Sequence, residues 1–286
     1  MIERIIEPHI VPLVGALTVN RVLPRGGRGV GPFFFLDHFG PWMHEPGSSA
    51  LDVPPHPHTG LSTLTYLFEG EILHRDSLGN VQPILPGEVN WMTAGKGVVH
   101  SERVPLERSG ERFQVQGLQA WVALPESHET IDPWFSHHDH ASVPRWAAEG
   151  VSYALLAGEA LGRQSPVQCY SRLFYLMIEA EVGRRIEFDP EGQEACFYLL
   201  SGEVTVDGQK IRGPSLIIFK PGTSVAIASE SPVRGAFLGG ENIGPRHMEW
   251  NFVSSSRERI EQAKRDWREQ KFQKIPGETE WIPLPG

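Results

Sequence analysis

The chain has 286 residues, with 26 Lys and Arg against 35 Asp and Glu, a net charge of −9 and 40% hydrophobic residues. This composition excludes an intrinsically disordered chain, and the negative charge argues against a sequence-independent grip on nucleic acid. The sequence has no run of about 18 uncharged apolar residues that could span a bilayer, and its 30 glycines and 24 prolines favour many short strands over long helices.

The N-terminal segment and the cysteines indicate the compartment. Glu3, Arg4 and Glu7 stand where a secretory signal needs apolar residues, so we expect a cytoplasmic protein. Cys169 and Cys196 lack metal-ligand or redox spacing, and we expect two plain buried thiols. The length allows one large domain or two of about 140 residues.

The first candidate functional residues are histidines in the segment 54–60, Pro-Pro-His-Pro-His-Thr-Gly. Alternate residues of a strand point to one face about 7 Å apart, so His56 and His58 can converge. His100 and Glu102 repeat this spacing in a later segment. If the two strands are neighbours, three imidazoles and one carboxylate meet, as in the coordination shell of a divalent transition metal.

The strands that follow reveal an internal repeat. Leu61–Leu67 is rich in β-branched and aromatic residues and predicts a strand. The turn Tyr66–Ile72 recurs as Tyr198–Val204, and the apolar strand Val89–Met92 recurs as Leu216–Phe219. The chain is therefore predicted to be all-β and duplicated, with two β-barrels or sandwiches. Two further short strands are expected at Ala120–Leu124 and Gly202–Val206.

The repeat sets the expected domains. We place an N-terminal metal-binding domain at 1–135, a linker at 136–150, and a C-terminal domain with a helix at 151–286. Within the linker, His137, His138, Asp139 and His140 are nearly consecutive and cannot all point inward, so they predict a solvated surface patch.

A helix is expected only near the C-terminal end. Ser255 and Glu258 have the spacing of a capping box. Ile260, Ala263, Trp267 and Lys271 follow at helical spacing. The narrow apolar stripe predicts a surface helix packed on a barrel.

The second copy serves as an internal control for the metal site. Alignment on the turns places Phe188 and Pro190 opposite His56 and His58. Ile227 and Ser229 fall opposite the later ligand pair, His100 and Glu102. The second copy thus has the scaffold without the ligands, which predicts one metal per chain, held by the first copy.

These motifs resemble the pirin family of bicupins. The resemblance rests on His-Pro-His-x-Gly, on Tyr-Leu-x-Glu-Gly, on the block 91–102 (Trp-Met-Thr-Ala-Gly-Lys-Gly-Val-Val-His-Ser-Glu) and on Gly-Leu-Gln-Ala-Trp-Val at 117–122. It implies two face-to-face cupin β-barrels with a metal in the N-terminal one. The implied ligands are His56, His58, His100 and Glu102, with Fe(II) the first candidate and Ni, Cu, Mn, Co and Zn as alternatives.

The resemblance also implies an activity. Several members of the family cleave quercetin with O2, so the implied partners are a flavonol or another small aromatic enol, and dioxygen. Glu102 is the one base that the motif supplies. Other members are redox-sensitive binding proteins with a regulatory protein partner, and the sequence leaves that alternative open.

Three further polar residues have open roles. Gln119 is either a substrate contact or a core amide. His74 is expected at the rim or surface, and His38 is expected at a capped strand end, with support of the metal site from a distance as its alternative.

Overall fold

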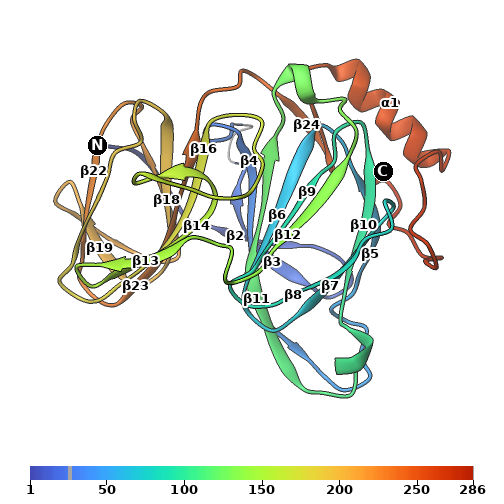
Figure 1. Ribbon diagram of the computed structural model, residues 1–286, viewed down its shortest axis with the longest axis horizontal. Coiled ribbons are helices and arrows are strands. Elements are labelled where there is room, and N and C mark those ends of the chain that lie inside the picture. Colours follow the sequence, from blue (N-terminus) through green and yellow to red (C-terminus); the bar gives the residue numbers. More distant parts are fainter. Residues whose placement is uncertain (25–27, 286) are drawn as a thin grey trace. The chain divides into compact units, whose positions relative to one another are not determined.

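The computed structural model describes residues 1–24 and 28–285, and its secondary structure is mostly β (Figure 1). The predicted mostly β fold with a helix near the C-terminal end is confirmed. The helix α1 runs from Arg257 to Arg268. In the part of the chain that the structure describes, no helix combines the length and the apolar character needed to cross a membrane.

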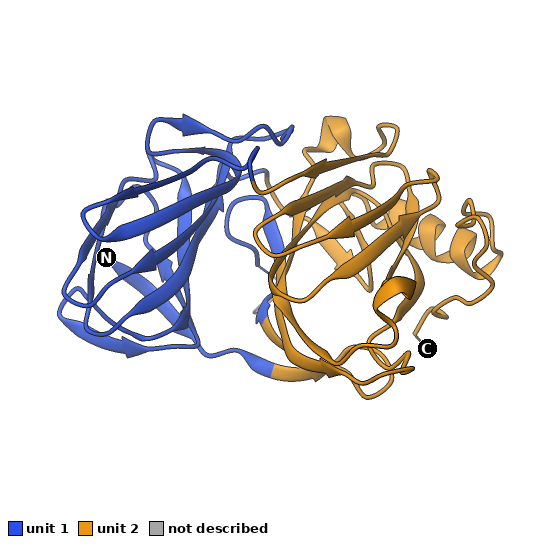
Figure 2. Ribbon diagram, turned by 60° about the horizontal axis from the view of Figure 1, so that its bottom comes forward, with its two compact units in different colours: residues 1–9, 22–34, 141–243 blue, residues 10–21, 35–140, 244–286 orange. Residues whose placement is uncertain are grey.

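The chain forms two compact units, and each is built from separate stretches of sequence (Figure 2). Unit 1 contains residues 1–9, 22–34 and 141–243, and unit 2 contains residues 10–21, 35–140 and 244–286. The expected boundaries at 1–135 and 151–286 differ from these units. The reason is pairing and packing between distant segments: the first strand joins unit 1, and residues 244–286, with α1, join unit 2.

Unit 1 contains two antiparallel sheets. The larger has the strand order β1-β21-β18-β23-β16-β14-β13, with β15 paired to β14, and the smaller has the order β17-β22-β19-β20. The bounds are β1 Ile2–Ile6, β13 Arg145–Ala148, β14 Val151–Ala160, β15 Arg163–Gln164, β16 Leu173–Ala180, β17 Arg185–Phe188, β18 Glu194–Ser201, β19 Glu203–Val206, β20 Gln209–Arg212, β21 Ser215–Phe219, β22 Val225–Ser229 and β23 Val233–Gly240.

Aromatic rings fill the core of unit 1. Phe188 stacks on Phe237 with ring centroids 4.4 Å apart, and Phe174 and Phe197 each lie 4.8 Å from one of these two rings. All four are at most 3% exposed. Burial of such side chains contributes roughly 2 kcal/mol each, so this interior is built for stability.

Unit 2 also contains two antiparallel sheets and a short strand pair. Their orders are β5-β10-β7-β8, β12-β9-β6-β11-β4-β3-β2 and β24-β25. The bounds are β2 His9–Pro12, β3 Thr18–Leu23, β4 Phe33–His44, β5 Val53–His58, β6 Leu61–Glu69, β7 Ile72–Asp76, β8 Val81–Ile84, β9 Val89–Thr93, β10 Val98–Arg103, β11 Phe113–Ala123, β12 Trp134–His138, β24 His247–Glu249 and β25 Phe252–Ser254, with 3-10 turns at Leu106–Arg108 and Glu126–His128. Among residues 1–24 and 28–285 the pairings leave each sheet open, so closure into barrels stays a prediction.

The expected linker at 136–150 is wrong in part, because it contains ordered strands. Strand β12 pairs with β9, and β13 pairs with β14. These segments become strands because β9 and β14 lie beside them and pair with their backbones. The composition of the segments themselves does not reveal these partners.

The segment 244–286 covers the outer side of the strand β10. Ile260, Ala263 and Trp267 of α1 pack with Val99 in one buried cluster, so the predicted apolar stripe is confirmed. The cap differs by one residue from the prediction, because the Ser256 hydroxyl accepts from the backbone N–H of Arg259. Lys271 lies beyond the end of the helix and is exposed.

Ion pairs fasten the same segment to the rest of unit 2. The Glu278 carboxylate accepts hydrogen bonds from Ser101 Oγ (2.8 Å) and Arg103 Nε (3.1 Å), both on β10. Glu129, with a side chain 1% exposed, pairs with Arg246 at 2.9 Å and accepts a hydrogen bond from the backbone N–H of Ser255 at 2.7 Å. The outer side of the β10 strand is therefore held by residues far away in the sequence.

Candidate metal centre

Three histidines converge in unit 2 because β5 and β10 are antiparallel neighbours. His56 pairs with His100 in register, and His58 follows on the same face of β5. The candidate ligand atoms of His56, His58 and His100 all lie within 4.8 Å of one another. The prolines between them are tolerated because β5 is an edge strand of its sheet.

The three imidazoles are buried and electrically neutral at neutral pH. They are 7%, 1% and 2% exposed, in the order of the sequence. Burial lowers the pKa of His56 to about 4 and lowers the pKa of His58 and of His100 well below the usual range. A neutral imidazole is the form that ligates a metal.

Hydrogen bonds orient the candidate ligand nitrogens. His56 Nδ1 lies 2.9 Å from the carbonyl oxygen of Pro54, so Nδ1 carries the proton and Nε2 presents its lone pair. His58 Nε2 and His100 Nε2 face each other at 3.1 Å. Buried nitrogen ligand atoms that face one another fit a divalent transition metal. Without a metal their lone pairs would repel each other, and the positive charge of a metal ion would attract both.

Glu102 lies two residues after His100 on β10, and it is half-buried. Burial raises the pKa of its carboxyl group. The Thr65 hydroxyl approaches Glu102 Oε1 at 3.5 Å, which is a weak hydrogen bond. In the described part of the chain, the group of ligand atoms within 4.8 Å contains the three histidines and not Glu102, so its role as a fourth ligand stays a prediction.

Gln119 lies on β11 and is half-buried. Its Oε1 accepts a hydrogen bond from the Thr65 hydroxyl at 2.8 Å, which orients the side-chain amide. Nearby, the Trp121 ring meets the His58 ring edge to face at 5.1 Å and stacks on Phe35 at 3.9 Å. The centre therefore has an apolar aromatic wall beside one oriented amide.

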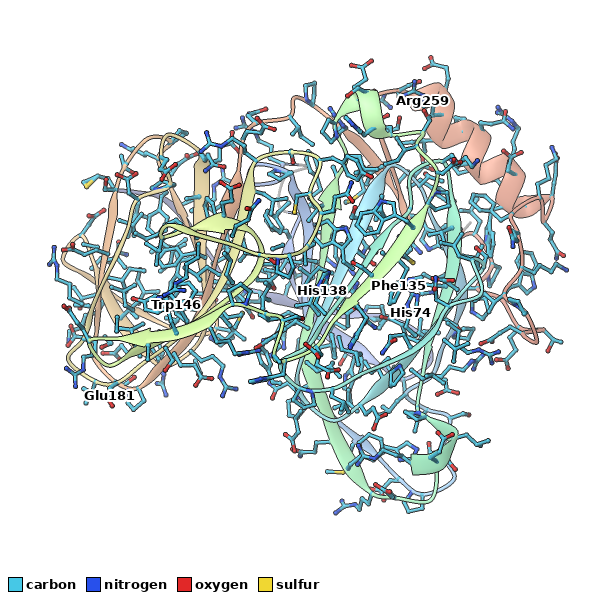
Figure 3. The ribbon with its side chains drawn as sticks, viewed as in Figure 1. His74, Phe135, His138, Trp146, Glu181 and Arg259 are labelled. Carbon is cyan, nitrogen blue, oxygen red and sulfur yellow. The ribbon has the colours of Figure 1, made fainter. Side chains whose placement is uncertain are left out.

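The prediction that His74 lies at the rim or surface is wrong. His74 is 5% exposed, and its ring stacks on the Phe135 ring with centroids 4.5 Å apart. Figure 3 labels the two neighbouring residues. Its Nδ1 lies 3.4 Å from His100 Nδ1, and its Nε2 lies 3.1 Å from Asp76 Oδ2. The signal that could have found it is the His-x-Asp alternation of residues 74–76, which repeats the spacing of the ligand pairs.

Asp76 is buried at the end of β7 and caps the turn that follows. Its Oδ1 accepts from the backbone N–H groups of Leu78 and Asn80. Burial by itself raises the pKa of the Asp76 carboxyl, but hydrogen bonds from His74 and Asn80 outweigh it and the net shift is downward. Asp76 is therefore an anionic acceptor.

The other candidate residues lie apart from the three histidines. His38 is inside β4 and not at a strand end as expected, and its ring contacts Gln116 Nε2 at 3.0 Å. His137 and His138 belong to the strand β12 and are half-buried, whereas Asp139 and His140 are exposed, so the predicted solvated patch is correct only for the latter two. Cys196 is buried and Cys169 half-buried; both are free thiols, and burial raises the pKa of each to about 12.

Unit 1 carries apolar residues where unit 2 carries the candidate ligands. The strand pair β17–β22 matches β5–β10 in sheet order, and Ile186 pairs with Ile227 as His56 pairs with His100. The sequence alignment placed Phe188 opposite His56, and this register places Ile186 there instead. The shift is two residues, so the same face of β17 points inward. Ile186 and Ile227 belong to the buried apolar core.

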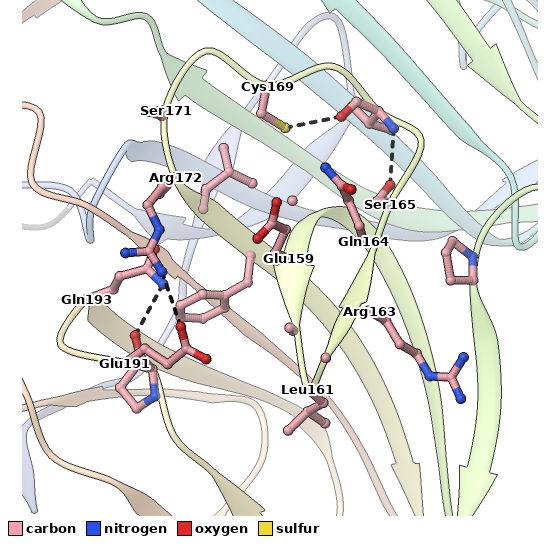
Figure 4. Close-up of a pocket in the computed structure, with 18 of the residues that line it drawn as sticks. Glu159, Leu161, Arg163, Gln164, Ser165, Cys169, Ser171, Arg172, Glu191 and Gln193 are labelled. Atoms are coloured by element: carbon pink, nitrogen blue, oxygen red, sulfur yellow. Dashed lines mark hydrogen bonds and ion pairs between the residues drawn. The ribbon is translucent and has the colours of Figure 1, made fainter.

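Unit 1 also contains an open cavity of about 1320 Å³. It lies between the β14–β15 hairpin, the segment 165–172 and the segment 189–193 (Figure 4). Arg172 pairs with Glu191 across its edge at 3.2 Å. Among the described residues that line it, none belongs to a cluster of metal-ligating side chains.

Comparison with known proteins gives two family matches. The family model described as Pirin matches residues 17–122, and the Pirin C-terminal cupin domain matches residues 175–273. A pirin-like protein from Caulobacter vibrioides is 49% identical, over 95% of this chain and 96% of the relative.

Solved structures agree with this fold. A crystal structure of quercetin 2,3-dioxygenase from Acinetobacter baumannii superposes with a TM-score of 0.90 at 30% identity, over 99% of this chain and 95% of that chain. A bacterial pirin from Escherichia coli in complex with nickel(II) has a TM-score of 0.64 at 18% identity, over 82% and 96% of the two chains, and this likeness shows the fold alone.

Proposed function

Because this chain belongs to the pirin family, we propose that it is a metal-dependent dioxygenase that cleaves quercetin-type flavonols with O2. The observation that carries the proposal is the convergence of three buried, neutral imidazoles within 4.8 Å. The name and the fold of the Acinetobacter baumannii quercetin 2,3-dioxygenase support the choice of substrate class.

The proposed centre holds one divalent transition metal per chain. His56, His58 and His100 supply nitrogen ligands, and Glu102 supplies the compensating carboxylate from the same strand as His100. Fe(II) is the proposed metal, with Ni, Cu, Mn, Co and Zn as alternatives. When bound, such an ion supplies Lewis acidity and open positions for an organic oxygen and for O2.

The residues around the centre have separate proposed roles. Glu102 accepts the proton of the flavonol 3-hydroxyl, for which its carboxylate must loosen from the metal. Gln119, oriented by Thr65, donates a hydrogen bond to a substrate oxygen. The aromatic wall of Trp121 and Phe35 excludes water and packs against the flavonol rings.

Oxygen uptake with quercetin tests the activity. Iron-loaded protein should consume O2, and the His56→Ala variant should not, because it lacks one of the ligands. Metal-loaded protein without uptake would refute the dioxygenase and favour a redox-sensitive binding protein. Metal content below about 0.2 per chain, even after reconstitution, would refute the metal centre itself.

A second variant tests Glu102 as the base. Glu102→Gln keeps an oxygen ligand of the same shape and cannot accept the proton at neutral pH. With metal retained, turnover should fall at least about 100-fold. Full turnover in metal-loaded Glu102→Gln would remove Glu102 from this role.

A further inference from the structure

The pair His74 and Asp76, which we name the dyad, lies on β7 beside the ligand strand β10. Asp76 pairs in register with His100, and His74 pairs with Glu102. Residues directly opposite in an antiparallel pair point to the same face, so the dyad shares a face with the ligands. Both dyad residues are at most 5% exposed.

The hydrogen bonds of the dyad form a chain that leads from Asp76 to His100. Asp76 Oδ2 lies 3.1 Å from His74 Nε2, and His74 Nδ1 lies 3.4 Å from His100 Nδ1. Beyond them, His100 Nε2 faces His58 Nε2 at 3.1 Å.

Counting protons along this series fixes the role of each nitrogen. An ionised carboxylate only accepts, so His74 Nε2 carries the proton and donates it to Asp76. If His74 is the neutral imidazole, this single N–H leaves its Nδ1 as an acceptor. His100 Nδ1 is then the donor, and His100 Nε2 retains the lone pair that a metal ligand needs.

We propose that the dyad is a positioning device that holds His100 in the tautomer and ring orientation in which its Nε2 ligates the metal. This inference rests on the metal centre proposed above and adds two residues outside the ligand set. Support of a ligating histidine by a hydrogen-bonded partner typically changes metal affinity by about 10–100-fold.

Two neighbours contact the dyad. The Phe135 ring stacks on His74 with an interplanar angle of 15° and takes no part in the hydrogen bonds of the dyad. Asn80 donates its side-chain amide to Asp76 Oδ2 at 2.8 Å and its backbone N–H to Asp76 Oδ1 at 3.0 Å, so donors other than His74 also hold the carboxylate.

Unit 1 provides an internal comparison. The strand β19 takes the place of β7, since it pairs with β22 as β7 pairs with β10. Val204 pairs there with Ser229, and Val206 pairs with Ile227. Both valines are buried, at 0% and 2% exposure. A valine thus replaces each residue of the dyad in the unit that lacks the ligands, which ties the dyad to the metal centre and not to the β scaffold.

Binding of Co²⁺ to the full chain tests the proposal, with dissociation constants measured by competition with a chelating dye. His74→Phe keeps a flat ring to stack on Phe135 but offers no acceptor to His100, and its affinity should fall about 10–100-fold. His74→Gln restores one acceptor and one donor and should recover part of the loss. Phe135→Leu is the matched control: it removes the stacked ring, keeps both hydrogen bonds, and should stay within about threefold of the parent.

Two outcomes would overturn the proposal: an affinity of His74→Phe within about threefold of the parent, or an equal loss in Phe135→Leu, which would indicate general packing. Nitrogen-15 NMR of the metal-free parent gives a test without any variant, with the proton expected on His100 Nδ1 and on His74 Nε2; the opposite tautomer of His100 would refute the inference. A parent chain that binds no Co²⁺ would instead refute the metal centre, so the two failures are distinguishable.

Discussion

Acidification of the metal-free protein from about pH 7.5 to about pH 5 should destabilise unit 2, and His38 and His56 together should contribute about 4 kcal/mol of this loss. Burial lowers the pKa of each to about 4, from 6.5 in the unfolded chain. Between these two values the unfolded state binds more protons, so the free energy of unfolding falls as the pH falls. At about pH 5 the unequal protonation of the two states amounts to about 2 kcal/mol for each histidine.

Urea unfolding followed by tryptophan fluorescence measures the loss of stability of unit 2, which contains both histidines. The chain has eight tryptophans, and Trp146 is the one that falls within residues 141–243, so the signal reports mainly unit 2. His38→Gln can keep an acceptor for Gln116 and does not titrate, so it should lose about 2 kcal/mol less than the parent. Bound metal should suppress the share of His56 and leave the share of His38. An equal loss in the parent and in His38→Gln would refute the reasoning.

Three further predictions concern the frame of unit 2. Glu129→Ala leaves Arg246 buried without its carboxylate and should lower the free energy of unfolding by about 3 kcal/mol, measured by the same urea titration. Gly60→Ala should cost about 3 kcal/mol or more, because φ is +71° and an added Cβ would lie 1.9 Å from a backbone oxygen; a midpoint like that of the parent would contradict this geometry. Glu278→Gln weakens the charge-assisted bonds to Arg103 and should lower the thermal midpoint by an amount that corresponds to about 1–2 kcal/mol, with no change expected if the segment 244–286 were loosely attached.

The convergence of the three histidines could be predicted because their signal is local. Two-residue spacing in a strand fixes which side chains share a face, and His56, His58 and His100 follow that rule without knowledge of the fold. Confirmation that β5 and β10 are neighbours needed the structure, since strand pairing depends on residues far away in the sequence. The position of the Glu102 carboxylate depends on its rotamer, which no spacing rule describes.

The buried position of His74 beside His100 could not be predicted from the sequence, for a different reason. A single histidine after a turn is a common surface feature, and His74 gains meaning only from His100 and Phe135, which lie on other strands. The predicted domain boundaries differ from the two units for a similar reason. Turns and prolines mark where strands end, but they do not show that β1 pairs with β21 or that Trp267 packs near Val99.

The interleaving of the two units has a consequence for the order in which the chain folds as it is synthesised. The ligand strands of unit 2 emerge from the ribosome early, but the segment 244–286 that covers and fastens β10 emerges after the whole of unit 1. Unit 1 is therefore the first to have all its residues available, although most of its strands are encoded later. A ribosome that stalls shortly after residue 243 would leave the apolar outer side of β10 bare, and this half-covered sheet is the species that chaperones would have to protect.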